Sequence, residues 1–133
     1  DQPNSFYQNW SWLLSSVNFC RRLDADLVSI ESVKQLDDLI SYIESLNTTS
    51  LNGYWLSAND LENEGTFKWL GTGQPMTVTR WAPSQPNNFN HFQNCVLIYN
   101  NGTDYVMNDM SCGQKANFIC EANNLQLVSF AVW

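Results

Sequence analysis

Basic residues are scarce in this sequence. It contains six Lys and Arg against 13 Asp and Glu, which gives a formal net charge of −7, and only Arg21 and Arg22 are adjacent. A surface that binds nucleic acid needs clustered Lys and Arg side chains to neutralise the phosphates. The composition therefore argues against nucleic acid as a partner.

Long apolar runs and catalytic motifs are also missing. No apolar run approaches the roughly 20 residues of a transmembrane helix, so we expect no membrane span. His91 is the only histidine and no two cysteines have Cys-x-x-Cys spacing, so a structural zinc site is not expected. The chain has no Gly-x-Ser-x-Gly, His-Glu-x-x-His or phosphate-loop motif and no nucleophile–base constellation. We therefore predict that the protein is not an enzyme.

The residues that are present are typical of one packed domain. The 133 residues are 44% hydrophobic and 14% charged, which is ordinary for a folded chain and unlike a disordered one. We expect a single domain over residues 1–133, with its core over about 6–121 and an apolar tail over 122–133. From the sequence alone, the tail is either a strand added to a sheet or a contact in a homo- or hetero-oligomer.

Cysteines and glycosylation sequons point to one cellular setting. Four cysteines allow three disulfide connectivities. Three Asn-x-Ser/Thr sequons begin at Asn9, Asn47 and Asn101. An even number of cysteines together with sequons favours an oxidising, extracellular location, so we predict a secreted glycoprotein.

The hydrophobic pattern changes along the chain. Apolar residues at three- and four-residue spacing predict helices over 10–23 and 32–46, and the second helix opens with a capping box from Ser32 to Gln35. Short apolar runs predict strands at 27–30, 54–57, 66–69, 95–99, 105–107 and 116–121. Residues 71–94 read as one long loop, which is often functional in a compact domain. Two helices followed by an antiparallel β region make the class α+β.

Side-chain oxygens crowd the segment from Trp81 to Asp109. Calcium takes six to eight oxygen ligands from such side chains. One interpretation is therefore a metal-binding loop, and the other is a polar turn built from Pro and Asn. The oxygen-bearing residues are Gln85, Asn87, Asn88, Gln93, Asn94, Asn108 and Asp109.

Ordered motifs over residues 6–121 resemble the C-type lectin-like domain family, especially its secreted insect members. Residues 55–60 resemble the family's core Trp-Ile-Gly-Leu strand, and 64–69 resemble its Glu-Gly-x-x-x-Trp signature. The other matches follow in family order: Cys20, residues 27–32, Trp81, Gln85-Pro86-Asn87, Cys95, Asn108-Asp109, Cys112 and Phe118-x-Cys120-Glu121. The resemblance implies two disulfides, Cys20–Cys120 and Cys95–Cys112.

The resemblance also implies a calcium site that binds sugar. In family members a calcium ion is held by five residues and by two sugar hydroxyls, and the proline of the tripeptide is commonly cis. The ligands map here to Gln85, Asn87, Gln93, Asn108 and Asp109. Amides replace acids at 85 or 87 and at 93, so the formal ligand charge falls from about −3 to about −1, and we expect calcium affinity of roughly 10⁻³ M or weaker.

A second family calcium site shares one residue with the first. It maps to Asp60, Glu64, Asn88, Gln93 and Asn94. The alternative for Glu64 is that it only braces its turn. Among the aromatics, Trp55 and Trp69 match core positions, Trp81 is ambiguous, and His91 and Phe92 lie in the loop where one could contact a ligand.

Two functions remain open at this stage. The first is a secreted carbohydrate-recognition domain with weak, calcium-assisted binding of microbial or cell-surface glycans, which implies a role in innate immunity. The second is a calcium-independent protein-interaction module that keeps the lectin-like fold with a degenerate calcium site.

Overall fold

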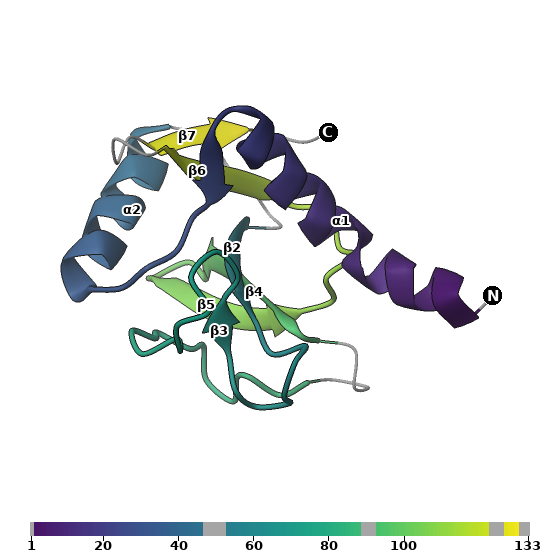
Figure 1. Cartoon of the computed structure of the whole chain (residues 1–133). Helices are drawn as coiled ribbons and strands as arrows, with labels where there is room; N and C mark the ends of the chain where they lie inside the picture. The colour runs from purple at the N-terminus through teal and green to yellow at the C-terminus, as the bar shows by residue number, and fades with distance from the viewer. Residues whose placement is uncertain (1, 47–52, 89–92, 123–126, 131–133) are drawn as a thin grey trace.

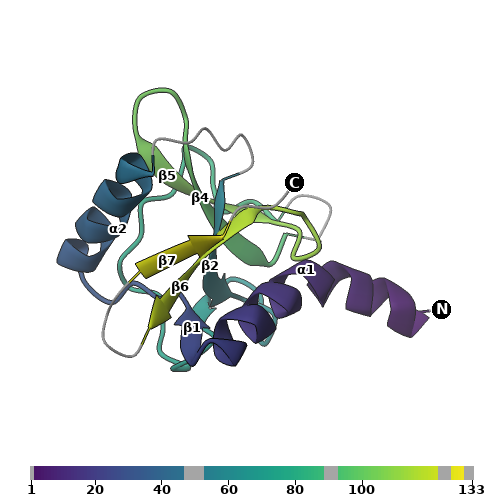
Figure 2. The same ribbon diagram turned by 90° about the horizontal axis from the view of Figure 1, so that it is seen from above.

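The computed structural model describes residues 2–46, 53–88, 93–122 and 127–130. Helices α1 (Gln2–Arg22) and α2 (Val33–Ser45) lie on either side of the strands in both views (Figures 1 and 2). The strands of the described part are β1 (Ala25–Leu27), β2 (Tyr54–Asn59), β3 (Lys68–Trp69), β4 (Cys95–Asn100), β5 (Tyr105–Met110), β6 (Asn117–Ala122) and β7 (Leu127–Phe130). The predicted α+β class is confirmed.

Local chemistry sets the ends of the helices. Arg21 and Arg22 occupy the last turn of α1, where positive charge complements the helix dipole. Asp24 follows with a positive φ of 58°, the left-handed conformation that commonly ends a helix. At the start of α2 the Ser32 side chain accepts a hydrogen bond from the Gln35 backbone N–H at 3.1 Å, as the capping box predicts. Helix α1 begins at Gln2, earlier than the sequence predicted.

The sheet is mixed rather than wholly antiparallel. Strands run in the order β1-β6-β2-β4-β5, with β3 paired to β2 and β7 paired to β6. Every pair is antiparallel except β2 with β6, which is parallel. Parallel pairing needs a long connection, and more than 50 residues separate these two strands in sequence. The described part of the apolar tail is therefore a strand of this sheet, which selects one of the two interpretations left open for it.

The strand predicted at 27–30 is shorter and shifted. Pairing ends at Leu27, and Val28 instead connects two strands: its N–H donates to the Ile119 carbonyl, and its own carbonyl accepts from Ser57, both at 3.0 Å. The chain leaves the ladder here while Val28 and Ile30 stay buried in the core.

Both predicted disulfides are present. Cys20–Cys120 closes a loop of 100 residues and joins α1 to β6, and the chain-entropy estimate for such a loop is about 4–5 kcal/mol. Cys95–Cys112 joins the start of β4 to the segment after β5, beside the long loop. No cysteine of the chain is left free.

Two hydrophobic clusters flank the sheet. One packs α2 against β2, β4 and the loop, and contains Leu39, Leu56 and Trp69. The other packs α1 against the opposite side, around Leu13 and Trp55. Trp55 and Trp69 are 0% and 1% exposed, so these two indoles are core side chains and cannot stack on a ligand. Among the described residues, no helix combines the length and the apolarity that a bilayer crossing requires.

Candidate functional site

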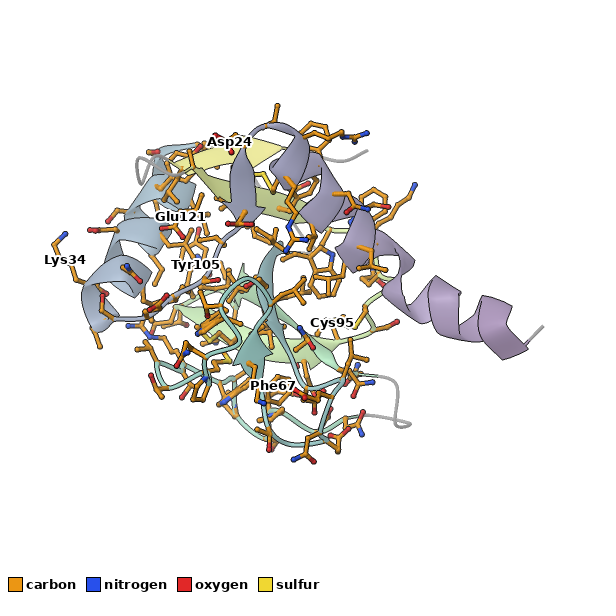
Figure 3. The ribbon with its side chains drawn as sticks, in the orientation of Figure 1. Asp24, Lys34, Phe67, Cys95, Tyr105 and Glu121 are labelled. Atoms are coloured by element: carbon orange, nitrogen blue, oxygen red, sulfur yellow. A yellow bond between two sulfur atoms is a disulfide. The ribbon has the colours of Figure 1, made fainter. Side chains whose placement is uncertain are left out.

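The candidate site lies where the long loop meets the ends of β4 and β5. Figure 3 shows Phe67 and Cys95 in the lower part of the molecule, which carries this loop. The Arg80 carbonyl accepts from the Met107 N–H at 2.7 Å, and the Ala82 N–H donates to the Met107 carbonyl at 2.8 Å. These two bonds hold the loop along β5. The half-buried Trp81 packs its ring against Phe67, with centroids 5.2 Å apart, so the ambiguous tryptophan has a packing role.

Asp109 organises the centre of the site. Its side chain is 0% exposed, and its two carboxylate oxygens accept hydrogen bonds from the backbone N–H groups of Asn87 at 3.1 Å and Asn88 at 2.6 Å. A buried carboxylate needs such charge-assisted bonds to offset its loss of hydration. Asp109 thus fastens the Gln85-Pro86-Asn87 segment to β5. The Gln85–Pro86 peptide bond is cis, as the resemblance implied.

Two amide oxygens of the predicted calcium ligands lack a partner. Gln85 Oε1 and Asn108 Oδ1 are both buried, and neither accepts a hydrogen bond from any described residue. An unsatisfied buried acceptor costs about 1–3 kcal/mol. Asn108 precedes Asp109 in β5, and Gln85 lies two residues before Asn87, whose N–H bonds to Asp109. The two oxygens are therefore unused acceptors for a cation or a hydroxyl donor.

Gln93 and Asn88 close the other side of the loop. The Gln93 N–H donates to Asn88 Oδ1 at 3.0 Å, and Gln93 Nε2 contacts the Met110 sulfur at 3.7 Å. Met110 is a residue that the sequence did not single out, and no signal in the sequence identifies it. His91 and Phe92 lie outside the described residues.

Three residues of the second predicted site, Asp60, Glu64 and Asn94, also meet. Asp60 is 1% exposed, and its Oδ2 accepts from the Gly65 N–H at 2.9 Å. The Asn94 side chain lies between two acids and, with its nitrogen toward them, donates to Asp60 Oδ1 at 3.0 Å and to Glu64 Oε1 at 3.1 Å. Burial, with a smaller effect of the neighbouring Glu64, raises the pKa of Asp60 to about 6. Glu64 therefore takes part in bracing the turn, whether or not a cation also binds.

The predicted ligand atoms are oxygens, as calcium prefers, but most of them belong to neutral amides rather than to carboxylates. Among the described residues, no group of three or more His, Cys, Asp or Glu side chains could hold a metal ion. The structure thus places amides where a strong calcium site has acids.

A separate acidic hollow lies elsewhere on the molecule. Its volume is about 250 Å³, and its lining includes the acids Asp26, Glu31 and Glu121. Burial raises the pKa of Glu121; the nearby Glu31 and Asp26 add to this, and a hydrogen bond from the Ser29 backbone opposes it. Figure 3 shows Glu121 in the upper part of the view, away from the long loop.

Comparison with known proteins assigns the family. The Lectin C-type domain matches residues 9–122. "C-type lectin 37Da" of Drosophila melanogaster is 34% identical over 130 residues, which cover 92% of this chain and 68% of that protein. "C-type lectin mosGCTL-7" of Aedes aegypti is 36% identical over 108 residues, covering 77% and 71%. The chain belongs to the C-type lectin domain family, and its relatives include insect lectins, as the resemblance indicated.

A solved structure shows the same fold. The cow C-type carbohydrate-recognition domain of CD23, solved in the presence of a GlcNAc2Man3 oligosaccharide, has a TM-score of 0.66 and 30% identity, covering 82% of this chain and 77% of that one. C-type lectins are carbohydrate-binding proteins without catalytic activity, which agrees with the prediction that this protein is not an enzyme.

Proposed function

We propose that this domain recognises carbohydrate at the site formed by the long loop and the end of β5, with weakly bound calcium as a bridge. The observation that carries the proposal is the pair of buried, unpartnered oxygens on Gln85 and Asn108. Calcium satisfies several oxygen acceptors at once, which a single hydrogen-bond donor does not. Gln85, Asn87, Gln93, Asn108 and Asp109 are the proposed ligands.

The charge of these ligands supports weak binding. Asp109 is the only acid of the five, and both of its oxygens already accept backbone hydrogen bonds. Neutral amide oxygens offset the dehydration of a doubly charged ion less well than carboxylates do. We infer a calcium dissociation constant of about 10⁻³ M or weaker, which suits extracellular calcium. Asp60, Glu64, Asn88, Gln93 and Asn94 form the proposed second calcium site.

The setting that we propose is extracellular. Two disulfides persist in oxidising compartments. The relatives in Drosophila and Aedes are named as C-type lectins. We therefore infer a secreted lectin that binds microbial or cell-surface glycans and acts in innate immunity.

One observation favours the calcium-independent alternative. Asp109 accepts hydrogen bonds from the backbone of Asn87 and Asn88, so this part of the loop is held by the chain's own groups. A preformed polar loop can also present a surface to a protein partner. This second function is a protein-interaction module on the same fold.

Glycan-array binding in millimolar calcium and then in chelator separates these functions. We expect binding in calcium that chelator abolishes. Binding that survives chelator would reject the calcium bridge and indicate direct hydrogen bonds from the amides. An absence of glycan binding under both conditions would support the protein-partner function.

A further inference from the structure

The turn between β4 and β5 carries the sequon Asn101-Gly102-Thr103 in an ordered and open conformation. The Asn101 N–H donates to the Asp104 carbonyl at 2.9 Å. Asn101 Oδ1 accepts from the N–H groups of Thr103 and Asp104, both at 2.9 Å. The side-chain oxygen of Asn101 is therefore engaged with its own turn, which fixes the direction of the amide.

The nitrogen of the same amide remains available. Among the described residues, Asn101 Nδ2 donates no hydrogen bond, and residues 100–104 are all exposed. Gly102 has a φ of 101°, and an added Cβ there would meet no atom within 4 Å. In Figure 2 this turn projects away from the body of the molecule. A bulky group on Asn101 thus has room in the folded protein.

The turn lies at the far end of its hairpin from the candidate site. Asp109 pairs with Val96 near one end of the hairpin, and Asn100 pairs with Tyr105 at the other. Cys95 and Asn100 are separated by five steps along β4, which is about 17 Å at 3.3 Å per residue. A group on Asn101 would be attached at the end of the hairpin away from the site.

We propose that Asn101 carries an N-linked oligosaccharide. The donor is a lipid-pyrophosphate-linked oligosaccharide of the secretory pathway. Asn101 Nδ2 forms a bond to C1 of the first sugar and loses one proton. The bond from C1 to the pyrophosphate oxygen breaks, and the lipid pyrophosphate leaves with the electron pair. The product is a hydrophilic surface glycan attached at the end of the hairpin away from the candidate site.

Peptide mapping of the secreted protein tests the proposal. The full chain is expressed behind a secretory leader in eukaryotic cells, and the peptide that contains Asn101 is weighed before and after treatment with a peptide N-glycosidase. We expect a glycan mass on this peptide and conversion of Asn101 to Asp after treatment. An unmodified Asn101 peptide in the secreted protein would overturn the proposal. Because the mapping is done on single peptides, the sequons at Asn9 and Asn47 do not interfere.

Two substitutions at one position provide matched controls. Thr103→Ala removes the sequon but keeps Asn101. The backbone N–H of residue 103, which donates to Asn101 Oδ1, is also kept. This variant should therefore lose the glycan and keep the turn. Thr103→Ser keeps the sequon and should keep the glycan. A glycan that persists in Thr103→Ala would contradict an N-linked attachment.

Enzymatic removal of the glycan should change calcium affinity by less than about twofold, given the separation from the site; a tenfold change would contradict that placement. The mass measurement does not depend on whether the domain binds sugar.

Discussion

Replacement of the buried acid at the centre of the site tests whether it holds the loop in the absence of metal. In Asp109→Asn one oxygen remains to accept from the backbone of Asn87 or Asn88, and the other position becomes an NH₂ group that faces an N–H donor. Either orientation of the amide leaves one of these backbone N–H groups without an acceptor, and it places the new NH₂ group, also without an acceptor, at a position that is 0% exposed. A charge-assisted hydrogen bond contributes about 1.5–3 kcal/mol, and an unsatisfied donor costs about 1–3 kcal/mol. We expect the free energy of unfolding to fall by about 2–4 kcal/mol.

Thermal unfolding in chelator, followed by Trp fluorescence, measures this effect. For a domain of this size, the loss corresponds to a decrease in Tm of roughly 6–15 °C. Asp104→Asn is the control, because it makes the same change of charge at an exposed position of the β4–β5 turn. Its Tm should stay within about 2 °C of the parent, since exposed charges contribute little. An unchanged Tm for Asp109→Asn in chelator would refute the reasoning, and would leave Asp109 with a role only when calcium is bound.

Three further outcomes are expected. Gln93→Glu restores a carboxylate at a position common to both proposed calcium sites, so calorimetry should show calcium binding about tenfold tighter or more; an unchanged affinity would mean that residue 93 does not face a cation. Gly53→Ala places a Cβ 2.7 Å from the Ile98 carbonyl oxygen at a φ of +81°, and urea denaturation should show a loss of about 2–4 kcal/mol. Gly65→Ala is the control, because φ is +87° there but no atom lies within 4 Å of the added Cβ. It should lose about 1–2 kcal/mol. Equal losses in the two variants would argue against a steric clash between the Cβ of residue 53 and the Ile98 carbonyl. Because burial raises the pKa of Glu121 above its ordinary value of 4.5, the parent should lose stability as pH rises above that value. Glu121→Gln removes this loss. The variant should therefore match the parent in unfolding free energy near about pH 4 and exceed it increasingly toward about pH 7. A difference between the two proteins that does not change with pH would contradict the raised pKa of Glu121.

Features that depend on neighbouring residues could be predicted from the sequence. The Ser32 cap acts on Gln35 three residues away, and the hairpin over residues 95–110 has its turn between its strands. The order of motifs around Cys20, Cys95 and Cys112 identified the family, and with it the two disulfides and the cis Gln85–Pro86 bond. The same order indicated that residues 85, 87, 93, 108 and 109 belong to one site.

The tertiary structure decided what the site residues do. The sequence predicted that Asp109 would be a calcium ligand, but its bonds to the backbone of Asn87 and Asn88 join positions more than 20 residues apart. The meeting of Asp60 with Asn94 likewise requires the loop to fold back on β4. The parallel pairing of β2 with β6, and the addition of β7 to β6, depend on how distant segments are brought together. Periodicity reports which side of an element is apolar, and it carries no information on which distant backbone groups a buried carboxylate will meet.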